Sequence, residues 1–140
     1  MKQKSPSNFA IRQFVPNDTN RVIFIWEQCD LVRNWNNPNF DIQRKLNFQK
    51  ELFFVGLLND EIIATAMFGY DGHRGWLNYF AVLPNFQKRG FGKQLMTFGE
   101  MALIERGCPK LNLQIRNDNN KAINFYQKVG YKEDAAVSFG

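Results

Sequence analysis

Residues that build metal centres and cross-links are scarce in this sequence. Its 140 residues include one histidine and two cysteines, and Cys29 and Cys108 are far apart with no Cys-x-x-Cys spacing. A zinc site needs three or four such ligands close together, so no metal is expected. Both cysteines are predicted to be reduced and buried, and neither has neighbours that would activate a nucleophilic thiol.

Long apolar segments are missing as well. The longest run, residues 52–58, is far shorter than the roughly 20 residues of a membrane-spanning helix. The first residues, MKQKSPSNF, are polar and contain no apolar core of a secretory signal. The sequence therefore predicts a cytoplasmic protein with no membrane partner.

An excess of positive charge is the main feature of the composition. There are 18 Lys and Arg residues against 13 Asp and Glu residues, which gives a net charge of +5. This balance suits an anionic ligand, but an ordinary protein surface accounts for it equally well. The basic residues form no continuous run, so nucleic acid is not expected as a partner. The cluster of Lys88, Arg89 and Lys93 fits a small polyphosphate better.

The hydrophobic pattern predicts one domain over residues 9–140, preceded by a flexible polar lead over residues 1–8. Expected strands cover 9–15, 52–58, 62–69, 76–82, 111–115 and the segment from Tyr131 onward. Expected helices follow Asp18 and Pro38 and cover 92–105 and 121–129. The order βααβββαβαβ predicts an α/β (α+β) fold, in which helices flank a mixed, mostly antiparallel sheet.

Residues 87–92, QKRGFG, follow a predicted strand and open a predicted helix. The free amides of a first helical turn point outward, and the helix dipole there favours negative charge. Gly90 and Gly92 lack the Cβ atoms that would hold a phosphate away from the backbone. The pattern is neither a Walker loop nor a GxGxxG fingerprint, and glycine pairs are common in turns, so the loop alone does not identify its ligand.

Two motifs resemble the GNAT superfamily of N-acetyltransferases. Residues 81–92, AVLPNFQKRGFG, match every fixed position of the superfamily's pyrophosphate-binding motif, V-x-P-x-x-[QR]-x-x-G-x-[GA]. Residues 119–131, NNKAINFYQKVGY, are similar to its N-x-x-A-x-x-[FL]-Y-x-x-x-G-[FY] segment. The resemblance extends over about residues 9–139 and includes the order of elements. A narrower likeness, to the YpeA-type branch of single-domain bacterial acetyltransferases, lies in residues 26–31, 35–38 and 69–75.

The resemblance implies an enzyme that transfers acetyl from acetyl-CoA to a primary amine, directly and in a ternary complex. The acceptor would be a small molecule, an amino acid or a peptide N-terminus. Backbone groups of the strand ending at residue 82 would pair with the pantetheine arm, and Asn119 would bind that arm, cap a helix, or do both. The implied CoA-binding residues are Phe80, Ala81, Val82, Gln87, Lys88, Arg89, Gly90, Phe91, Gly92, Lys93, Asn119 and Tyr126.

Tyr126 is the general acid that the resemblance implies. A phenol with a pKa near ~10 suits a thiol leaving group near ~8.5, although packing in the core is an alternative role for this ring. The general base stays open, because the strand positions where many relatives carry a glutamate hold Asn78, Tyr79 and Gln114. The remaining candidates are Asp71, His73 or water, with Asp30 and Glu27 as further side chains.

The acceptor pocket is expected between the first two helices and the hairpin loop at residues 71–75. There, Arg33 would pair with a substrate carboxylate, Trp35 would form an apolar wall and Asp30 would receive the amine, unless these residues are only caps and a solvated loop. The missing strand carboxylate leaves a second interpretation, a CoA-binding regulatory or partner module without catalysis. A monomer and a homodimer stay open, with the last strand of the sheet missing or exchanged between copies.

Overall fold

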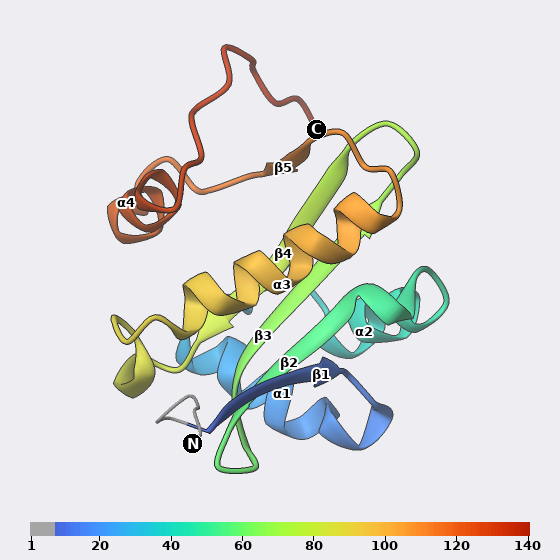
Figure 1. Ribbon diagram of the computed structural model, residues 1–140, viewed down its shortest axis with the longest axis vertical. Helices are drawn as coiled ribbons and strands as arrows, with labels where there is room; N and C mark the ends of the chain where they lie inside the picture. Colours follow the sequence, from blue (N-terminus) through green and yellow to red (C-terminus); the bar gives the residue numbers. More distant parts are fainter. Residues whose placement is uncertain (1–7) are drawn as a thin grey trace.

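The computed structural model describes residues 8–140, so the lead predicted over residues 1–8 lies almost entirely outside the described part (Figure 1). One sheet contains five strands in the order β1-β2-β3-β4-β5. They are β1 (Phe9–Gln13), β2 (Phe53–Leu58), β3 (Glu61–Tyr70), β4 (Gly75–Val82) and β5 (Leu111–Leu113). Neighbours are antiparallel except β4 and β5, which pair in parallel.

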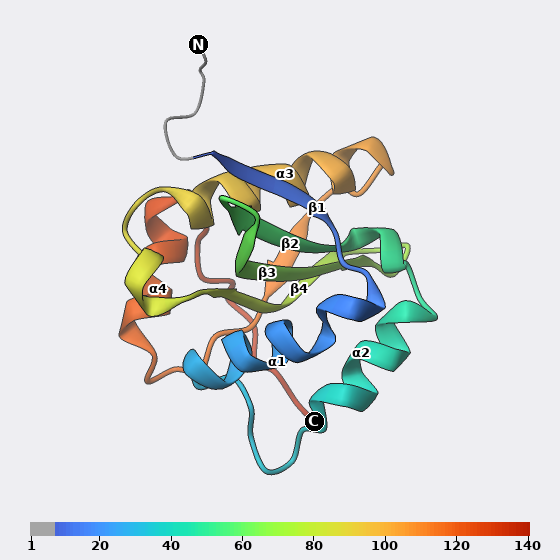
Figure 2. The same ribbon diagram turned by 90° about the horizontal axis from the view of Figure 1, so that it is seen from below.

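Helices cover both faces of this sheet. The long helices are α1 (Thr19–Gln28), α2 (Pro38–Leu46), α3 (Phe91–Glu105) and α4 (Asn120–Lys128). Three short 3-10 turns are η1 (Pro16–Asp18), η2 (Lys50–Leu52) and η3 (Pro84–Phe86). Figure 2 shows α1 and α2 on one face of the sheet and α3 on the other. The predicted fold class, a mixed and mostly antiparallel sheet flanked by helices, is confirmed.

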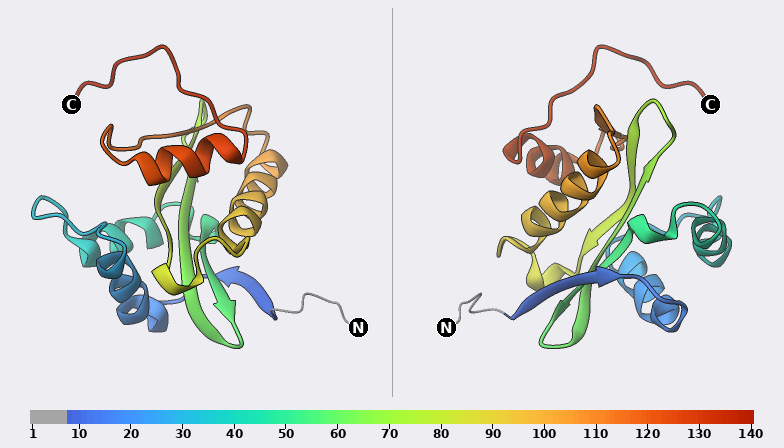
Figure 3. Two further views of the ribbon diagram at one scale, coloured as in Figure 1. Left: turned by 90° about the vertical axis from the view of Figure 1, so that its left-hand side faces the viewer. Right: turned by 45° about the vertical axis from the view of Figure 1, so that its right-hand side comes forward.

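The strand predicted from Tyr131 onward is wrong, because the chain after α4 forms no strand (Figure 3). Residues 132–140 are all exposed, so they gain no apolar burial from pairing with β5. Side chains make the contacts instead: Asn112 Nδ2 donates to Asp134 Oδ2 at 2.7 Å, and Gln114 Nε2 donates to Ser138 Oγ at 2.6 Å. Likewise β5 ends at Leu113, two residues before its predicted end.

The core lies on both faces of β3 and β2. Trp26, Phe53 and Phe68 are completely buried, and the rings of Phe14 and Phe53 stack with centroids 4.3 Å apart. Cys29 and Cys108 are free thiols, and both are half-buried, not buried as predicted. These packed aromatic rings hold the two helical layers at fixed positions on the sheet.

Gly99 allows α3 to lie close to the sheet. A Cβ atom on Gly99 would stand only 2.0 Å from Cζ of the buried Phe68. Gly99→Ala gains about 1 kcal/mol of helix propensity, but we expect the overlap to cost more and to leave a net destabilisation of about 1–3 kcal/mol. Urea unfolding measures this, with Thr97→Ala on the exposed face of α3 as the matched control. A more stable Gly99→Ala variant would contradict the close packing.

Candidate active site

An irregular position in β4 marks the centre of the candidate site. Thr65 is paired with Ala81 but Met67 with Asn78, so β4 contains one extra residue opposite β3. The extra residue is accommodated at Tyr79, whose φ of +53° is unusual for a bulky side chain.

Buried contacts from α1 and β3 hold Tyr79 in this conformation. Thr65 Oγ1 donates to the Tyr79 carbonyl oxygen at 2.9 Å and accepts from Trp26 Nε1 at 2.9 Å. The ring of Tyr79 stacks on Trp26 with centroids 3.8 Å apart. The strained turn of β4 is therefore fixed by the core and not by the loop that follows it.

Beyond this bulge, the edge of β4 that faces β5 has no strand partner. Within residues 8–140, the two strands pair only between Gly75–Leu77 and Leu111–Leu113. At the end of the open stretch, the Val82 carbonyl oxygen accepts from Gln87 Nε2 at 2.8 Å and from Cys29 Sγ at 3.3 Å. Residues 78–82 thus leave backbone groups available to an extended ligand.

The loop after β4 delivers the free end of a long helix to the same place. Lys88 and Gly90 have φ values of +63° and +87°, and these two turns direct the chain into α3. No side chain caps α3, and the first backbone bond of its opening turn runs from Gln94 N to Gly90 O, at 3.1 Å. The amides before Gln94 point into the loop, an arrangement that suits a phosphate.

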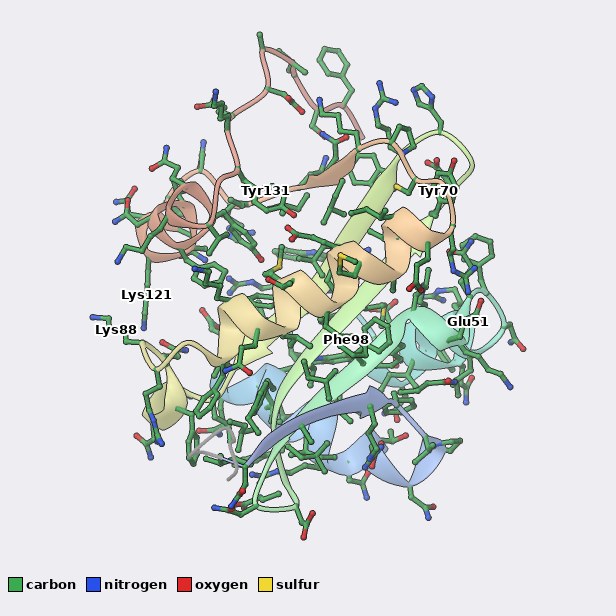
Figure 4. All side chains as sticks on the ribbon, in the orientation of Figure 1. Glu51, Tyr70, Lys88, Phe98, Lys121 and Tyr131 are labelled. Atoms are coloured by element: carbon green, nitrogen blue, oxygen red, sulfur yellow. The ribbon has the colours of Figure 1, made fainter. Side chains whose placement is uncertain are left out.

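Basic side chains surround this loop. The guanidinium of Arg89 lies 5.1 Å from the ring centroid of Phe91, which fixes it beside the start of α3. Lys88 on the loop and Lys121 on α4 extend from the same side of the molecule (Figure 4). Together they give this end of the protein a positive field that favours a polyanion.

Aromatic contacts join α4 to both the loop and the open edge of β4. The ring of Phe80 stacks on Phe125 with centroids 5.5 Å apart and lies 5.9 Å from Tyr126. A Cβ atom on Gly92 would come within 3.2 Å of Phe125 Cζ, so α3 begins directly against α4. Asn119 Oδ1 accepts from Ala122 N at 3.1 Å and therefore caps α4.

The hydroxyl of Tyr126 differs from those of the other three partly buried tyrosines, of which Tyr70 donates to the Gly72 carbonyl oxygen at 3.4 Å. Tyr79 donates to Asp41 Oδ2 and Tyr131 to Glu100 Oε2, each at 2.5 Å. Across residues 8–140 the Tyr126 hydroxyl has no hydrogen-bond partner of its own. Burial raises the pKa of Tyr126, so this hydroxyl keeps its proton at neutral pH.

The β3–β4 hairpin holds the candidate bases Asp71 and His73. Asp71 Oδ1 accepts from the backbone N–H groups of Arg74 and His73, both at 2.8 Å, and Oδ2 accepts from Trp76 Nε1 at 3.1 Å. These hydrogen bonds lower the pKa of Asp71, and the bond from the Arg74 N–H has the largest effect. A carboxylate stabilised in this way is a weak base, and its main role is to shape the turn.

The predicted acceptor residues lie in the connection between α1 and α2. Arg33 Nη1 donates to both oxygens of Asp30 at 3.4 Å, and these two residues pair on the surface. Trp35 is 69% exposed, with the guanidinium of Arg116 5.9 Å from its ring centroid. These three residues do not line the groove described next, although their neighbours Leu31 and Asn36 do.

An open groove of about 670 Å³ lies between α2 and the β3–β4 hairpin. Its charged side chains are Asp41, Arg44 and Lys45 from α2 and Asp71 from the hairpin. The groove reaches β4 at Asn78 and Tyr79, immediately before the open edge of that strand. The sequence predicts an acceptor pocket between the first two helices and the hairpin, but its pattern indicates no role for Lys45.

Comparison with known proteins decides the family. Residues 20–131 match the model of the Acetyltransferase (GNAT) family. The chain belongs to the GNAT acetyltransferase family. An acetyltransferase of Yersinia pestis (strain Pestoides F) is 46% identical over 130 residues, which cover 93% of this chain and 92% of that protein.

Solved GNAT structures share the fold. Ard1 from Thermoplasma volcanium is 25% identical, with a TM-score of 0.79 over 91% of this chain and 85% of that one. AAC(6')-Iy, in complex with the bisubstrate analogue CoA-S-monomethyl-acetylneamine, is 18% identical, with a TM-score of 0.77 over 96% and 97% of the two chains. The sequence-based assignment to GNAT acetyltransferases is confirmed.

The residues of this GNAT chain fit CoA. The start of α3 offers free amides beside basic side chains, and no atom lies within 4 Å of the Cβ position of Gly90. Among residues 8–140, no group of three or more His, Cys, Asp or Glu is placed to hold a metal ion. Within the same range, no helix combines the length and the apolar composition needed to cross a bilayer.

Proposed function

We propose that this protein transfers the acetyl group of acetyl-CoA to a primary amine, directly and in a ternary complex. One juxtaposition supports the proposal: α4 packs its Phe125 ring against the start of α3 and its Tyr126 ring near Phe80, on the open edge of β4. The acceptor is a small molecule, an amino acid or a peptide N-terminus. The complex of AAC(6')-Iy with a CoA–acetylneamine analogue supports an amine acceptor for this fold.

Binding of CoA is assigned to backbone groups. The amides at residues 88–93 bind the pyrophosphate, and Lys88, Arg89 and Lys93 add charge to the same anion. The open edge of β4 over residues 80–82 pairs with the amide groups of the pantetheine arm, as it would with a further strand. Bound acetyl-CoA supplies an activated acetyl thioester.

The protein contributes proton transfer and polarisation. In the transfer, a bond forms between the amine nitrogen and the acetyl carbon as the carbon–sulfur bond breaks. Tyr126 donates its hydroxyl proton to the departing sulfur. A backbone N–H beside the bulge at Tyr79 polarises the thioester carbonyl. Since Asp71 is engaged by three N–H donors, water or a side chain of the groove takes the proton from the amine.

Initial-rate kinetics test the ternary complex. With acetyl-CoA and amine both varied, we expect double-reciprocal lines that intersect. Parallel lines, together with an acetylated protein found by mass spectrometry in the absence of amine, would show a covalent route and contradict direct transfer.

A second function, a CoA-binding module without catalysis, has one observation in its favour. β4 and β5 contain no Asp or Glu that could act as the strand base. In that case acetyl-CoA binds, but no amine accelerates the release of CoA. The unpartnered Tyr126 hydroxyl favours the enzyme.

A further inference from the structure

Two opposite charges line the groove between α2 and the β3–β4 hairpin without forming a pair with each other. Asp41 and Lys45 are four residues apart on α2, so they share one face of the helix, and both line the groove. Asp41 forms its ion pair with Arg44, which also lines the groove and has a side chain that is 70% exposed. Among the ion pairs within residues 8–140, Lys45 takes part in none.

Lys45 is a buried ammonium that lacks a counter-ion. The residue is only 8% exposed, and its Nζ donates one hydrogen bond, to the Phe68 carbonyl oxygen at 2.5 Å. An ammonium has three N–H donors, and the other contact of Nζ among the described residues is with the ring of Phe48, whose centroid is 5.7 Å away. Burial is the main cause that lowers the pKa of Lys45 to about 8. The negative charge of Glu51 raises this pKa, and the positive charge of Arg106 lowers it further. A bound anion would supply the missing partner.

The acidic end of the groove lies next to the open edge of β4. Tyr79 donates its hydroxyl to Asp41 Oδ2 at 2.5 Å, and Tyr79 is the strained residue that immediately precedes Phe80. A cation bound at this pair would therefore lie near the place where the acetyl group is proposed to bind. The phenol oxygen of Tyr79 retains acceptor capacity for such a cation.

We propose that the groove binds a small aminocarboxylate as the acetyl acceptor, with its ammonium at the Asp41–Tyr79 pair and its carboxylate at Lys45. This inference rests on the proposed function and names the substrate class of that site. Side chains four apart on a helix are about 5–6 Å apart at Cβ, so the two charges of the ligand are separated by a short aliphatic chain. Phe48, Met67 and Trp76 line the groove alongside that chain.

The same pair offers a route for the proton that the ammonium must lose. That proton moves to the Tyr79 oxygen as the hydroxyl proton of Tyr79 moves to Asp41, so the amine becomes neutral and the carboxylate becomes protonated. Arg44 stays paired with Asp41 and lies 70% exposed, so its charge near the amine is screened by water. Asp71, at the other end of the groove, remains engaged in the hairpin turn.

The first arm of the test uses the unchanged protein. Glycine, β-alanine, 4-aminobutyrate and 5-aminopentanoate are each compared with their uncharged carboxamides, and CoA release from acetyl-CoA is followed. We expect at least one acid to exceed its carboxamide in kcat/KM by about 10- to 100-fold, the effect of one charge-assisted contact. Equal rates for acids and carboxamides would overturn the proposal.

The second arm uses Lys45→Met, which retains most of the side-chain volume. The best acid should show a KM raised by about 10- to 100-fold, while kcat/KM for its carboxamide and the affinity for acetyl-CoA stay unchanged. Lys50→Met, at an exposed lysine of η2 outside the groove, is the matched control. An equal loss for acid and carboxamide, or a rise in KM in Arg33→Met but not in Lys45→Met, would overturn the assignment.

Failure of this inference is distinguishable from failure of the proposed function. If other primary amines release CoA while every aminocarboxylate is inert, the inference is wrong and the N-acetyltransferase proposal stands. If no amine of any kind releases CoA, both are wrong. The first arm uses the unchanged protein, so it can still contradict the inference if the Lys45→Met variant misfolds.

Discussion

The Gly90→Glu variant is expected to lose affinity for acetyl-CoA by more than about 100-fold, because several losses coincide. Gly90 has a φ of +87°, which an L-residue adopts only with strain. A glutamate there also places a negative charge at the start of α3, where the free amides favour a phosphate. Each charge-assisted bond to phosphate is worth about 1.5–3 kcal/mol, so the loss of one or two such bonds is enough to lower the affinity for acetyl-CoA by this factor. Calorimetric titration with acetyl-CoA measures the change.

Gly107 provides a matched control at the opposite end of α3. Its φ is +82°, and, as at Gly90, no atom lies within 4 Å of its Cβ position. Gly107→Glu therefore introduces the same strain, about 1–2 kcal/mol, and the same charge, away from the candidate site. Both variants should lose similar thermal stability. An equal loss of acetyl-CoA affinity in both would show that strain alone is responsible and would contradict the anion site.

The Tyr126→Phe variant is expected to lower kcat by about 10²- to 10⁴-fold with little change in acetyl-CoA affinity. Its hydroxyl has no partner among residues 8–140, and the ring keeps its contacts with Phe80 and Phe125 when the oxygen is removed. The effect should therefore fall on the chemical step and not on folding. Steady-state kinetics with any accepted amine measure kcat, and calorimetric titration measures the affinity for acetyl-CoA.

Tyr131→Phe is the control for this substitution. Tyr131 lies against Tyr126 with ring centroids 6.0 Å apart, but its hydroxyl is already bonded to Glu100. We expect a modest loss of stability, about 1 kcal/mol, and an unchanged kcat. If Tyr126→Phe retained full kcat, Tyr126 would be a packing residue and the proton would have to come from elsewhere.

The loop that we propose binds phosphate could be anticipated from sequence, because the signals for its turn and helix start are local. Glycines at 90 and 92 after a strand, followed by a helix pattern, specify a turn into a helix N-terminus whatever the rest of the chain does. The sequence likewise predicts that Asn119 can cap a helix, because asparagine is preferred at that position. Such features depend on a few neighbouring residues, so the start of α3 and the cap of α4 lie where the sequence predicts them.

The bulge at Tyr79 could not be predicted, because its cause is not local. A tyrosine rarely adopts a positive φ, and here the conformation depends on Thr65 and Trp26, which come from β3 and α1. The error after Tyr131 has a similar origin. The composition of that segment permits a strand, but the Asp134 and Ser138 side chains, and not the backbone, make its hydrogen bonds to Asn112 of β5 and to Gln114 just beyond it.

The groove that we propose for the acceptor depends on packing that the sequence does not indicate. The spacing of Asp41 and Lys45 is visible in the sequence, but a charged pair at this spacing on a helix ordinarily forms a surface ion pair. Only the packing of α2 over β3 buries Lys45 against Phe68 and turns Asp41 toward Tyr79. Long-range packing thus gives Asp41 and Lys45 different environments, although their spacing in the sequence is ordinary.

Amine-dependent release of CoA is the measurement that tests the central claim most directly. Acetyl-CoA labelled in its acetyl group is incubated with the protein and a panel of primary amines, and thiol release and the mass of each amine are followed together. We predict that thiol appears only with an accepted amine and that the label is recovered on that amine in equal amount. Binding of acetyl-CoA without amine-dependent release, across the whole panel, would contradict the account and leave a CoA-binding module.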